Sequence, residues 1–167
     1  MYDELTEVDI KKMQEEMEHR IRDLRPQLIE EVQVARAFGD LSENYEYKCA
    51  KQAKNRNDSR IRYLERMIRT AKVIQVESKA DAVSLFDKVT IFNEMVQQEM
   101  TLQIVTTLRQ DALKGLISKE SPVGKALMGH CVGDRVQIEV NDQLKYFVEI
   151  RAIEKGEDDE SLEISSY

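Results

Sequence analysis

The sequence IKKMQEEMEHRIRDLRPQLIEEVQVA, residues 10–35, decides the first part of the fold. Its apolar side chains recur at steps of three or four residues, which is the spacing of a helix face that packs against a second helix. Pro26 lies inside this pattern and lacks the amide hydrogen that a helix interior uses, so we expect a kink or a lost hydrogen bond there. The apolar seam consists of Ile10, Met13, Met17, Ile21 or Arg20, Leu24, Leu28, Val32 and Ala35.

A second seam with the same spacing follows after a short break around residues 38–42. So short a connection makes the two helices antiparallel neighbours within one chain. Asn57 occupies a seam position, where a polar side chain costs stability but fixes the register. We therefore predict an antiparallel coiled-coil hairpin over residues 1–76. The second seam consists of Tyr47, Ala50, Ala53 or Lys54, Asn57, Ile61, Leu64, Ile68 and Ala71.

Beyond residue 74 the pattern changes to short β-type runs. Asn141-Asp142 between the last two runs is typical of a hairpin turn. The expected strands cover residues 88–92, 100–107, 135–140 and 146–153.

A short helix is expected between these strands, over residues 121–129. Ser121 would be its N-cap, Pro122 would take the first helical position, and Gly129 would end it. The second half of the chain is thus predicted to be a small α+β domain over residues 80–155. The acidic segment 156–167 is expected to be a frayed tail.

The charge of the chain is unevenly divided. The formal net charge of −7 argues at first against nucleic acid as a binding partner. However, residues 1–46 carry 6 Lys and Arg against 13 Asp and Glu, whereas residues 48–72 carry 9 against 2. Two explanations stay open: two helices with complementary faces, or a basic stripe that follows a phosphate backbone.

The composition also indicates in which cell compartment the protein works. The two cysteines, Cys49 and Cys131, lie far apart without a surrounding His/Cys cluster, as expected of reduced thiols in a cytosolic protein. No apolar stretch approaches the ~20 residues of a membrane span, and the acidic N-terminus is unlike a signal peptide. We expect a soluble, cytoplasmic protein that is monomeric when free.

The segment between the two helices concentrates acidic residues. Asp40 and Glu43 are three residues apart, which matches a capping box that opens the second helix, and Gly39 would ease the turn. The same two carboxylates could instead ligate Mg²⁺, which prefers hard oxygen ligands. Two ligands are too few for a tight site, so another molecule would have to supply the others. The two interpretations do not exclude each other.

The segment ARAFGDLSENYEY, residues 35–47, resembles the hairpin-tip signature of the Gre transcript-cleavage factors. Residues 60–74 resemble the end of that family's hairpin, and residues 121–134 resemble its C-terminal domain. The resemblance spans nearly the whole chain. It implies an α+β protein in which an N-terminal coiled-coil hairpin precedes an FKBP-like domain.

The resemblance also implies a function. The hairpin would enter the secondary channel of a backtracked RNA polymerase, while the globular domain grips the channel rim. Asp40 and Glu43 would help hold a second Mg²⁺ shared with the polymerase, and Ser42 would position water or merely satisfy the helix start. The polymerase would then cleave the nascent RNA near its 3′ end. This chain would lend ligands to another enzyme's site without being an enzyme itself.

Other residues carry weaker expectations. Basic side chains of the second helix could guide RNA, or could simply pair with the first helix, and residues before the short helix could contact the channel rim. Phe38 and Tyr45 depart from the family's tip. A Gre-like inhibitor that binds polymerase without stimulating cleavage is the alternative function, against which the intact Asp40 and Glu43 argue. The contact candidates are Lys48, Lys51, Lys54, Arg56, Ser121 and Pro122.

Overall fold

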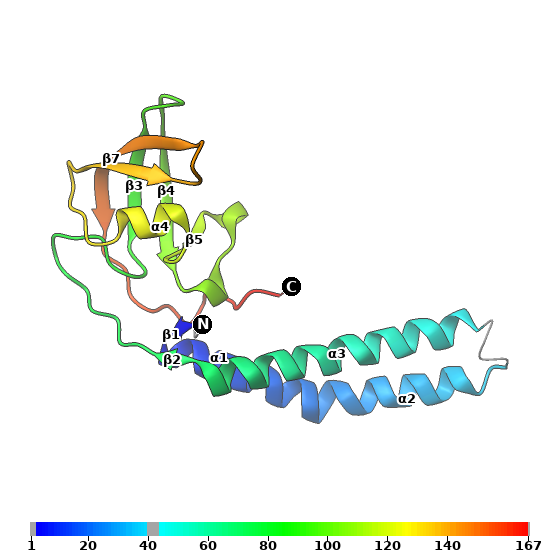
Figure 1. Cartoon of the computed structure of the whole chain (residues 1–167). Coiled ribbons are helices and arrows are strands. Elements are labelled where there is room, and N and C mark those ends of the chain that lie inside the picture. The colour runs from blue at the N-terminus through cyan, green and yellow to red at the C-terminus, as the bar shows by residue number, and fades with distance from the viewer. Residues whose placement is uncertain (1–2, 40–43, 167) are drawn as a thin grey trace. The chain divides into compact units, whose positions relative to one another are not determined.

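A computed structural model of the chain describes residues 3–39 and 44–166 (Figure 1). They form two compact units, one of residues 10–71 and one that combines residues 3–9 with residues 72–166. Within this described part, no helix has both the length and the apolar character needed to cross a membrane.

The first unit is a helical hairpin, as predicted. The first half of the hairpin contains α1 (Glu7–His19), whose first three residues belong to the other unit, then a π-helical turn (Arg20–Leu24), then α2 (Arg25–Arg36). The second half is α3 (Tyr45–Thr70), which lies beside α2 in Figure 1. Ile61, Leu64 and Met67 of α3 are buried, and all three follow the three-and-four spacing.

The π-helical turn explains how the first helix accommodates Pro26. The amide of Arg25 donates to the carbonyl of Arg20, a bond that spans five residues instead of four. A proline ring clashes with the carbonyl four residues earlier in a regular helix, and a wider turn just before it relieves that crowding. The local disturbance predicted at Pro26 is therefore a wide turn that inserts one extra residue. Of the two seam candidates, Ile21 is 42% exposed, and Arg20 faces α3.

Asn57 lies on the seam opposite this turn and is 4% exposed. Its side-chain nitrogen donates to the Arg20 carbonyl at 3.2 Å, and its side-chain oxygen accepts from Arg20 Nη1 at 3.0 Å. Glu16 accepts from Arg20 Nε at 2.7 Å and from two nitrogens of Arg60 at 2.9 and 3.0 Å. Burial alone would raise the pKa of Glu16, but the hydrogen bonds from Arg60 and Arg20 hold it below its usual value. We call these four residues the seam network.

The second unit is built on a five-stranded sheet in the order β5-β4-β3-β7-β6. All neighbouring strands are antiparallel except β4 and β5. The predicted strands are confirmed with shifts of one or two residues, whereas β5 is too short to have stood out in the sequence. The strands are β3 (Lys88–Asn93), β4 (Gln98–Val105), β5 (Leu116–Ser118), β6 (Arg135–Glu139) and β7 (Lys145–Glu154).

One face of this sheet carries the apolar core, because alternate residues along each strand point to the same side. The short helix α4 (Pro122–Leu127) packs onto the core through Leu127, which is fully buried. The α+β architecture is thus confirmed, while the FKBP-like fold of this domain stays a prediction. The strand residues in the core are Val89, Ile91, Leu102, Ile104, Val105, Val136, Ile138, Val148 and Ile150.

Two short strands bring the beginning of the chain into the second unit. β1 (Glu4–Leu5) pairs in parallel with β2 (Lys72–Val73), so residues 3–9 group with this unit, whereas the sequence predicts a hairpin over residues 1–76. Glu4 forms ion pairs with Lys119 and, at 2.9 Å, with Lys72. The hydrogen bonds from Lys119 and Lys72 lower the pKa of Glu4 to about 2.

A buried ion cluster joins three distant segments of the same unit. Asp9 and Thr6 form a capping box at the start of α1, with the Thr6 amide 3.1 Å from the Asp9 carboxylate. The other oxygen of Asp9 accepts from Arg109 Nε at 2.6 Å, and Arg109 Nη1 lies 2.6 Å from the Asp158 carboxylate. Arg109 ends the short 3₁₀ helix η2 (Thr107–Arg109), and its guanidinium lies 5.1 Å from the centre of the Phe86 ring.

Up to residue 166, the acidic C-terminal segment is held by hydrogen bonds to the second unit, which corrects the expectation of a frayed tail. The Gly156 amide and Lys155 Nζ both donate to Asp87, at 3.0 and 2.5 Å, and the Ser165 amide donates to the Leu108 carbonyl at 2.7 Å. A Cβ atom at Gly156 would lie 2.0 Å from the Phe86 carbonyl oxygen, so this close approach requires glycine. The segment is held because its polar groups find buried partners that are far away in sequence.

Candidate functional site at the hairpin turn

The three residues with predicted catalytic roles, Asp40, Ser42 and Glu43, lie outside the described residues, and their roles stay predictions. The structure describes the residues on both sides of them. On the α2 side the chain is described up to Gly39, and on the α3 side it resumes at Asn44.

Asn44 organises the α3 side of the turn. It is the N-cap of α3, since its side-chain oxygen accepts from the Tyr47 amide at 3.0 Å. Its side-chain nitrogen donates to the Ala35 carbonyl in the last turn of α2, at 2.7 Å. The Asn44 side chain thus accepts a hydrogen bond from a backbone amide at the start of α3 and donates one to a backbone carbonyl at the end of α2.

This arrangement corrects the predicted capping box. Asp40 would be the N-cap only if α3 began at residue 41, but the first helical residue is Tyr45. The cap therefore falls on Asn44, which is as good an N-cap residue as Asp. The sequence signal for it was present, because asparagine directly before a helical pattern is a common cap. What the sequence did not show is the second bond, to Ala35.

Two tyrosines follow the cap and have different surroundings. Tyr45 is 78% exposed, and a hydrogen bond with Cys49 raises the pKa of the Tyr45 hydroxyl. Tyr47 is half-buried, and Arg36 and Lys51 each lie 5.9 Å from the centre of its ring. Tyr47 therefore packs on the hairpin as its seam position predicted, whereas Tyr45 is available to solvent.

The four basic contact candidates of α3 lie in two kinds of environment. Lys48, Lys51 and Arg56 are exposed. Lys54 is half-buried and pairs with Asp58 at 2.9 Å.

Asp58 is also the point at which α3 pairs with the first helix, through Arg25 at 3.1 Å. The hydrogen bond from Lys54, supported by that from Arg25, lowers the pKa of Asp58 against the opposing effect of burial. Both explanations of the charge pattern thus keep some support. Arg25–Asp58 and Arg60–Glu16 are ion pairs between the helices, while the exposed side chains leave a basic stripe.

The two remaining contact candidates begin α4. The Ser121 hydroxyl accepts from the Gly124 amide at 3.0 Å and donates to the Ser118 carbonyl at 2.7 Å. Pro122 is the first helical residue, and Gly129 has a left-handed conformation with φ of 80° after the helix. The predicted helix and its ends are confirmed. A contact of Ser121 or Pro122 with another molecule stays a prediction.

Within residues 3–39 and 44–166, no three His, Cys, Asp or Glu side chains come together in a way that could hold a metal ion. Cys49 and Cys131 are free, exposed thiols.

Comparison with known proteins covers both units. One family model, described as transcription elongation factor, N-terminal, matches residues 4–73, and a second, described as transcription elongation factor, GreA/GreB, C-term, matches residues 72–155. The transcription elongation factor GreA of Mesomycoplasma hyopneumoniae (strain 7448) is 39% identical over 146 residues, which cover 87% of this chain and 90% of that protein. The GreA of Thermoanaerobacter pseudethanolicus is 43% identical over 137 residues, or 81% and 87% of the two chains.

Among solved structures, the GreA factor homolog 1 (Gfh1) protein of Thermus thermophilus matches 93% of this chain and 100% of its own, with a TM-score of 0.43 and 24% identity. The family models and the GreA relatives together define the class: a helical hairpin followed by a small sheet domain, in a transcription elongation factor. The chain belongs to the GreA/GreB family of these factors.

Proposed function

We propose that this elongation factor inserts its hairpin into the secondary channel of RNA polymerase and stimulates the polymerase's own cleavage of backtracked RNA. Family membership supports the role in elongation. The single observation that supports the cleavage mechanism is the position of Asn44. Asn44 caps α3 and bonds to α2, so the capping role that the sequence offered for Asp40 is already filled by another residue.

The dimensions of the hairpin agree with this role. α3 has 26 residues, hence a length of roughly 39 Å at ~1.5 Å per residue. A hairpin of that length can carry its turn deep into a channel. In the proposal, the globular unit makes the main contact with the channel rim, and residues around Ser121 and Pro122 take part in it.

The residues of the turn have distinct proposed roles. Asp40 and Glu43 would supply carboxylate oxygens to a Mg²⁺ ion that the polymerase also ligates. Two carboxylates are too few to hold the ion alone, so the polymerase would supply the other ligands. Such an ion polarises the phosphodiester bond and the attacking water. Ser42 would orient that water through its hydroxyl. The exposed basic side chains Lys48, Lys51 and Arg56, with Lys54, would guide the RNA 3′ end.

The test replaces both carboxylates at once. Asp40→Asn combined with Glu43→Gln keeps the size of each side chain, and α3 retains its own cap. We expect the free energy of unfolding and polymerase affinity to stay near the parent values, while stimulated RNA cleavage falls at least about 100-fold, since neutral amides are poor Mg²⁺ ligands. Cleavage of RNA in backtracked complexes measures the effect, and raised Mg²⁺ should restore part of it.

A matched control removes two exposed carboxylates elsewhere on the hairpin, by Glu15→Gln combined with Glu65→Gln, and should cleave like the parent. If the Asp40 and Glu43 variant binds polymerase and cleaves like the parent, the metal-ligand mechanism is wrong. If the parent binds polymerase but stimulates no cleavage, the chain is instead an inhibitor of the enzyme.

A further inference from the structure

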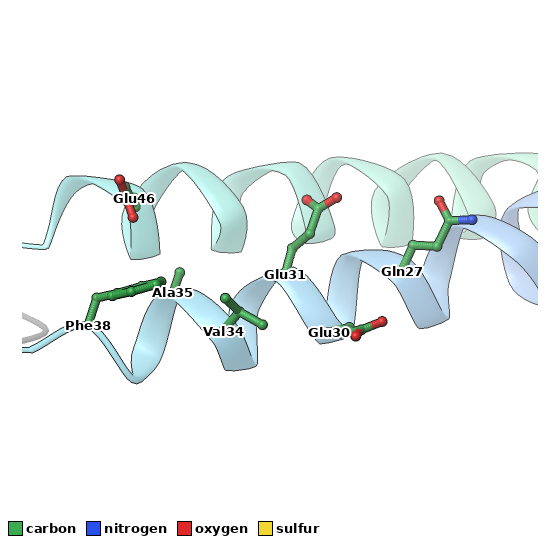
Figure 2. A pocket seen from close by; sticks show the side chains of 7 residues that line it. All are labelled: Gln27, Glu30, Glu31, Val34, Ala35, Phe38 and Glu46. Carbon is green, nitrogen blue, oxygen red and sulfur yellow. The ribbon is translucent and has the colours of Figure 1, made fainter.

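A groove near the turn of the hairpin is not used by the proposed mechanism. It has a volume of about 480 Å³ and is lined mainly by α2 and the residues after it, with Glu46 contributed by α3 (Figure 2). We define the tip groove by Glu30, Glu31, Val34, Phe38 and Glu46.

The wide turn before Pro26 accounts for the exposed apolar side chains of this groove. Up to that turn the seam advances by four, three and four residues, from Met13 to Leu24. The same alternation continued would put residues 27, 31, 34 and 38 against α3. The extra residue of the wide turn instead brings Leu28, Val32 and Ala35 to the seam, where they are half-buried or buried. The displaced stripe is exposed: Val34 is 52% and Phe38 71% accessible.

The groove also has a consistent charge. Figure 2 shows the Phe38 ring directed along α2 towards Ala35, with Glu46 on the facing helix. Glu30 and Glu31 flank the apolar side chains further along α2. An exposed apolar surface enclosed by carboxylates attracts cations and disfavours phosphates. This surface therefore differs from the basic stripe of α3, which suits RNA.

We propose that the tip groove binds a short protein segment of the polymerase in which a large apolar side chain is flanked by Lys or Arg. The apolar side chain packs on Val34 and Phe38, and the basic side chains face Glu30, Glu31 and Glu46. This inference rests on the proposed function, because insertion of the hairpin brings the groove against the channel wall. It adds a second attachment point, on the hairpin itself, to the contact made at the rim.

The first test removes the apolar contact in the full-length protein. Val34→Ser combined with Phe38→Ser should weaken polymerase binding about tenfold, as for a central apolar contact. Glu30→Gln combined with Glu31→Gln should reduce the salt dependence of binding. Ile29→Ser is the matched control, since Ile29 is a 37% exposed apolar residue of the same helix outside the groove, and should bind like the parent. Circular dichroism verifies that each variant is folded.

The second test identifies the occupant. A benzophenone amino acid at position 38 of the full-length protein, irradiated in the polymerase complex, should link to a polymerase peptide that contains Lys or Arg. Crosslinks to RNA or to a second copy of this chain would overturn the proposal. So would the absence of a crosslink, or groove variants that bind like a parent that itself binds and cleaves normally; these results leave the proposed function intact. A parent that does not bind polymerase at all refutes both.

Discussion

Two networks of arginines and carboxylates connect distant segments of this protein, and they differ in burial. In the second unit, the Asp9 and Arg109 side chains are fully buried and Asp158 is 16% exposed. In the seam network of the hairpin, Arg60 is 8%, Glu16 21% and Arg20 27% exposed.

The difference predicts different roles. Loss of one partner from a buried pair leaves a charge without solvent or counter-ion, which costs several times more than the same loss at a wet site. The buried cluster should therefore determine whether the second unit folds. Glu16 and Arg20 of the seam network are partly exposed to water, and the geometry of the network instead sets the register of the two helices.

The largest expected effect is that of Arg109→Met. It removes the cationic partner of the buried Asp9 carboxylate, so we expect the free energy of unfolding to fall by about 3–5 kcal/mol. Arg135→Met is the matched control, because Arg135 also pairs with a carboxylate, Glu94, and stacks on a phenylalanine, Phe147, but is 56% exposed. Denaturant unfolding of both variants measures the difference. Equal stability of the two variants would contradict the role given to burial.

A smaller loss is expected from Asn57→Ala, which removes both hydrogen bonds between Asn57 and Arg20. We expect the free energy of unfolding to fall by about 1–2 kcal/mol, because the Arg20 carbonyl in the wide turn loses its partner across the seam. Asn55→Ala lies on the exposed face of the same helix and has the same change in helix propensity, so it should be near neutral. Thermal or denaturant unfolding of the two variants measures the difference. If they unfold alike, Asn57 does not set the register of the helices.

Asn44→Ala should cost about 1 kcal/mol, the usual effect of losing an N-cap. Asn44→Asp separates the two bonds of this side chain, since a carboxylate still caps α3 but cannot donate to Ala35. We expect the Asp variant to lie between the parent and the Ala variant in helicity and unfolding free energy. If the Ala and Asp variants are equally destabilised, the bond to Ala35 and not the cap holds the turn.

The smallest effect concerns pH and Glu4, whose pKa is lowered from 4.5 to about 2 by Lys119 and Lys72. A carboxyl group with a lowered folded-state pKa stabilises the protein above its unfolded-state value, and this contribution is lost as the pH falls from about 4.5 towards 2. The stability difference between parent and Glu4→Gln should therefore be present at pH 6 and shrink over that range. In a Lys119→Met background the pH dependence of that difference should be much weaker; an unchanged dependence would assign it to another group.

Much of the fold followed from local patterns. The three-and-four spacing predicted both helices, short β-type runs predicted four of the five strands of the main sheet, and Ser121, Pro122 and Gly129 marked the short helix. These features can be predicted from the sequence because each is set by residues a few positions apart. The family signature of residues 35–47 likewise pointed to the elongation factors, which the family models then showed.

The features that join residues far apart in the chain become visible only in the folded protein. Arg109 meets Asp9 across 100 positions, and Asp87 holds Gly156 across 69, so no local pattern could show that the acidic segment is docked. The apolar spacing already placed Leu28, Val32 and Ala35 on the seam, but the wide turn before Pro26 that brings them there appears only in the structure. The spacing left Ile21 and Arg20 as alternatives at one seam position, and packing selects Arg20, because one inserted residue in the turn changes which side chains face the partner helix.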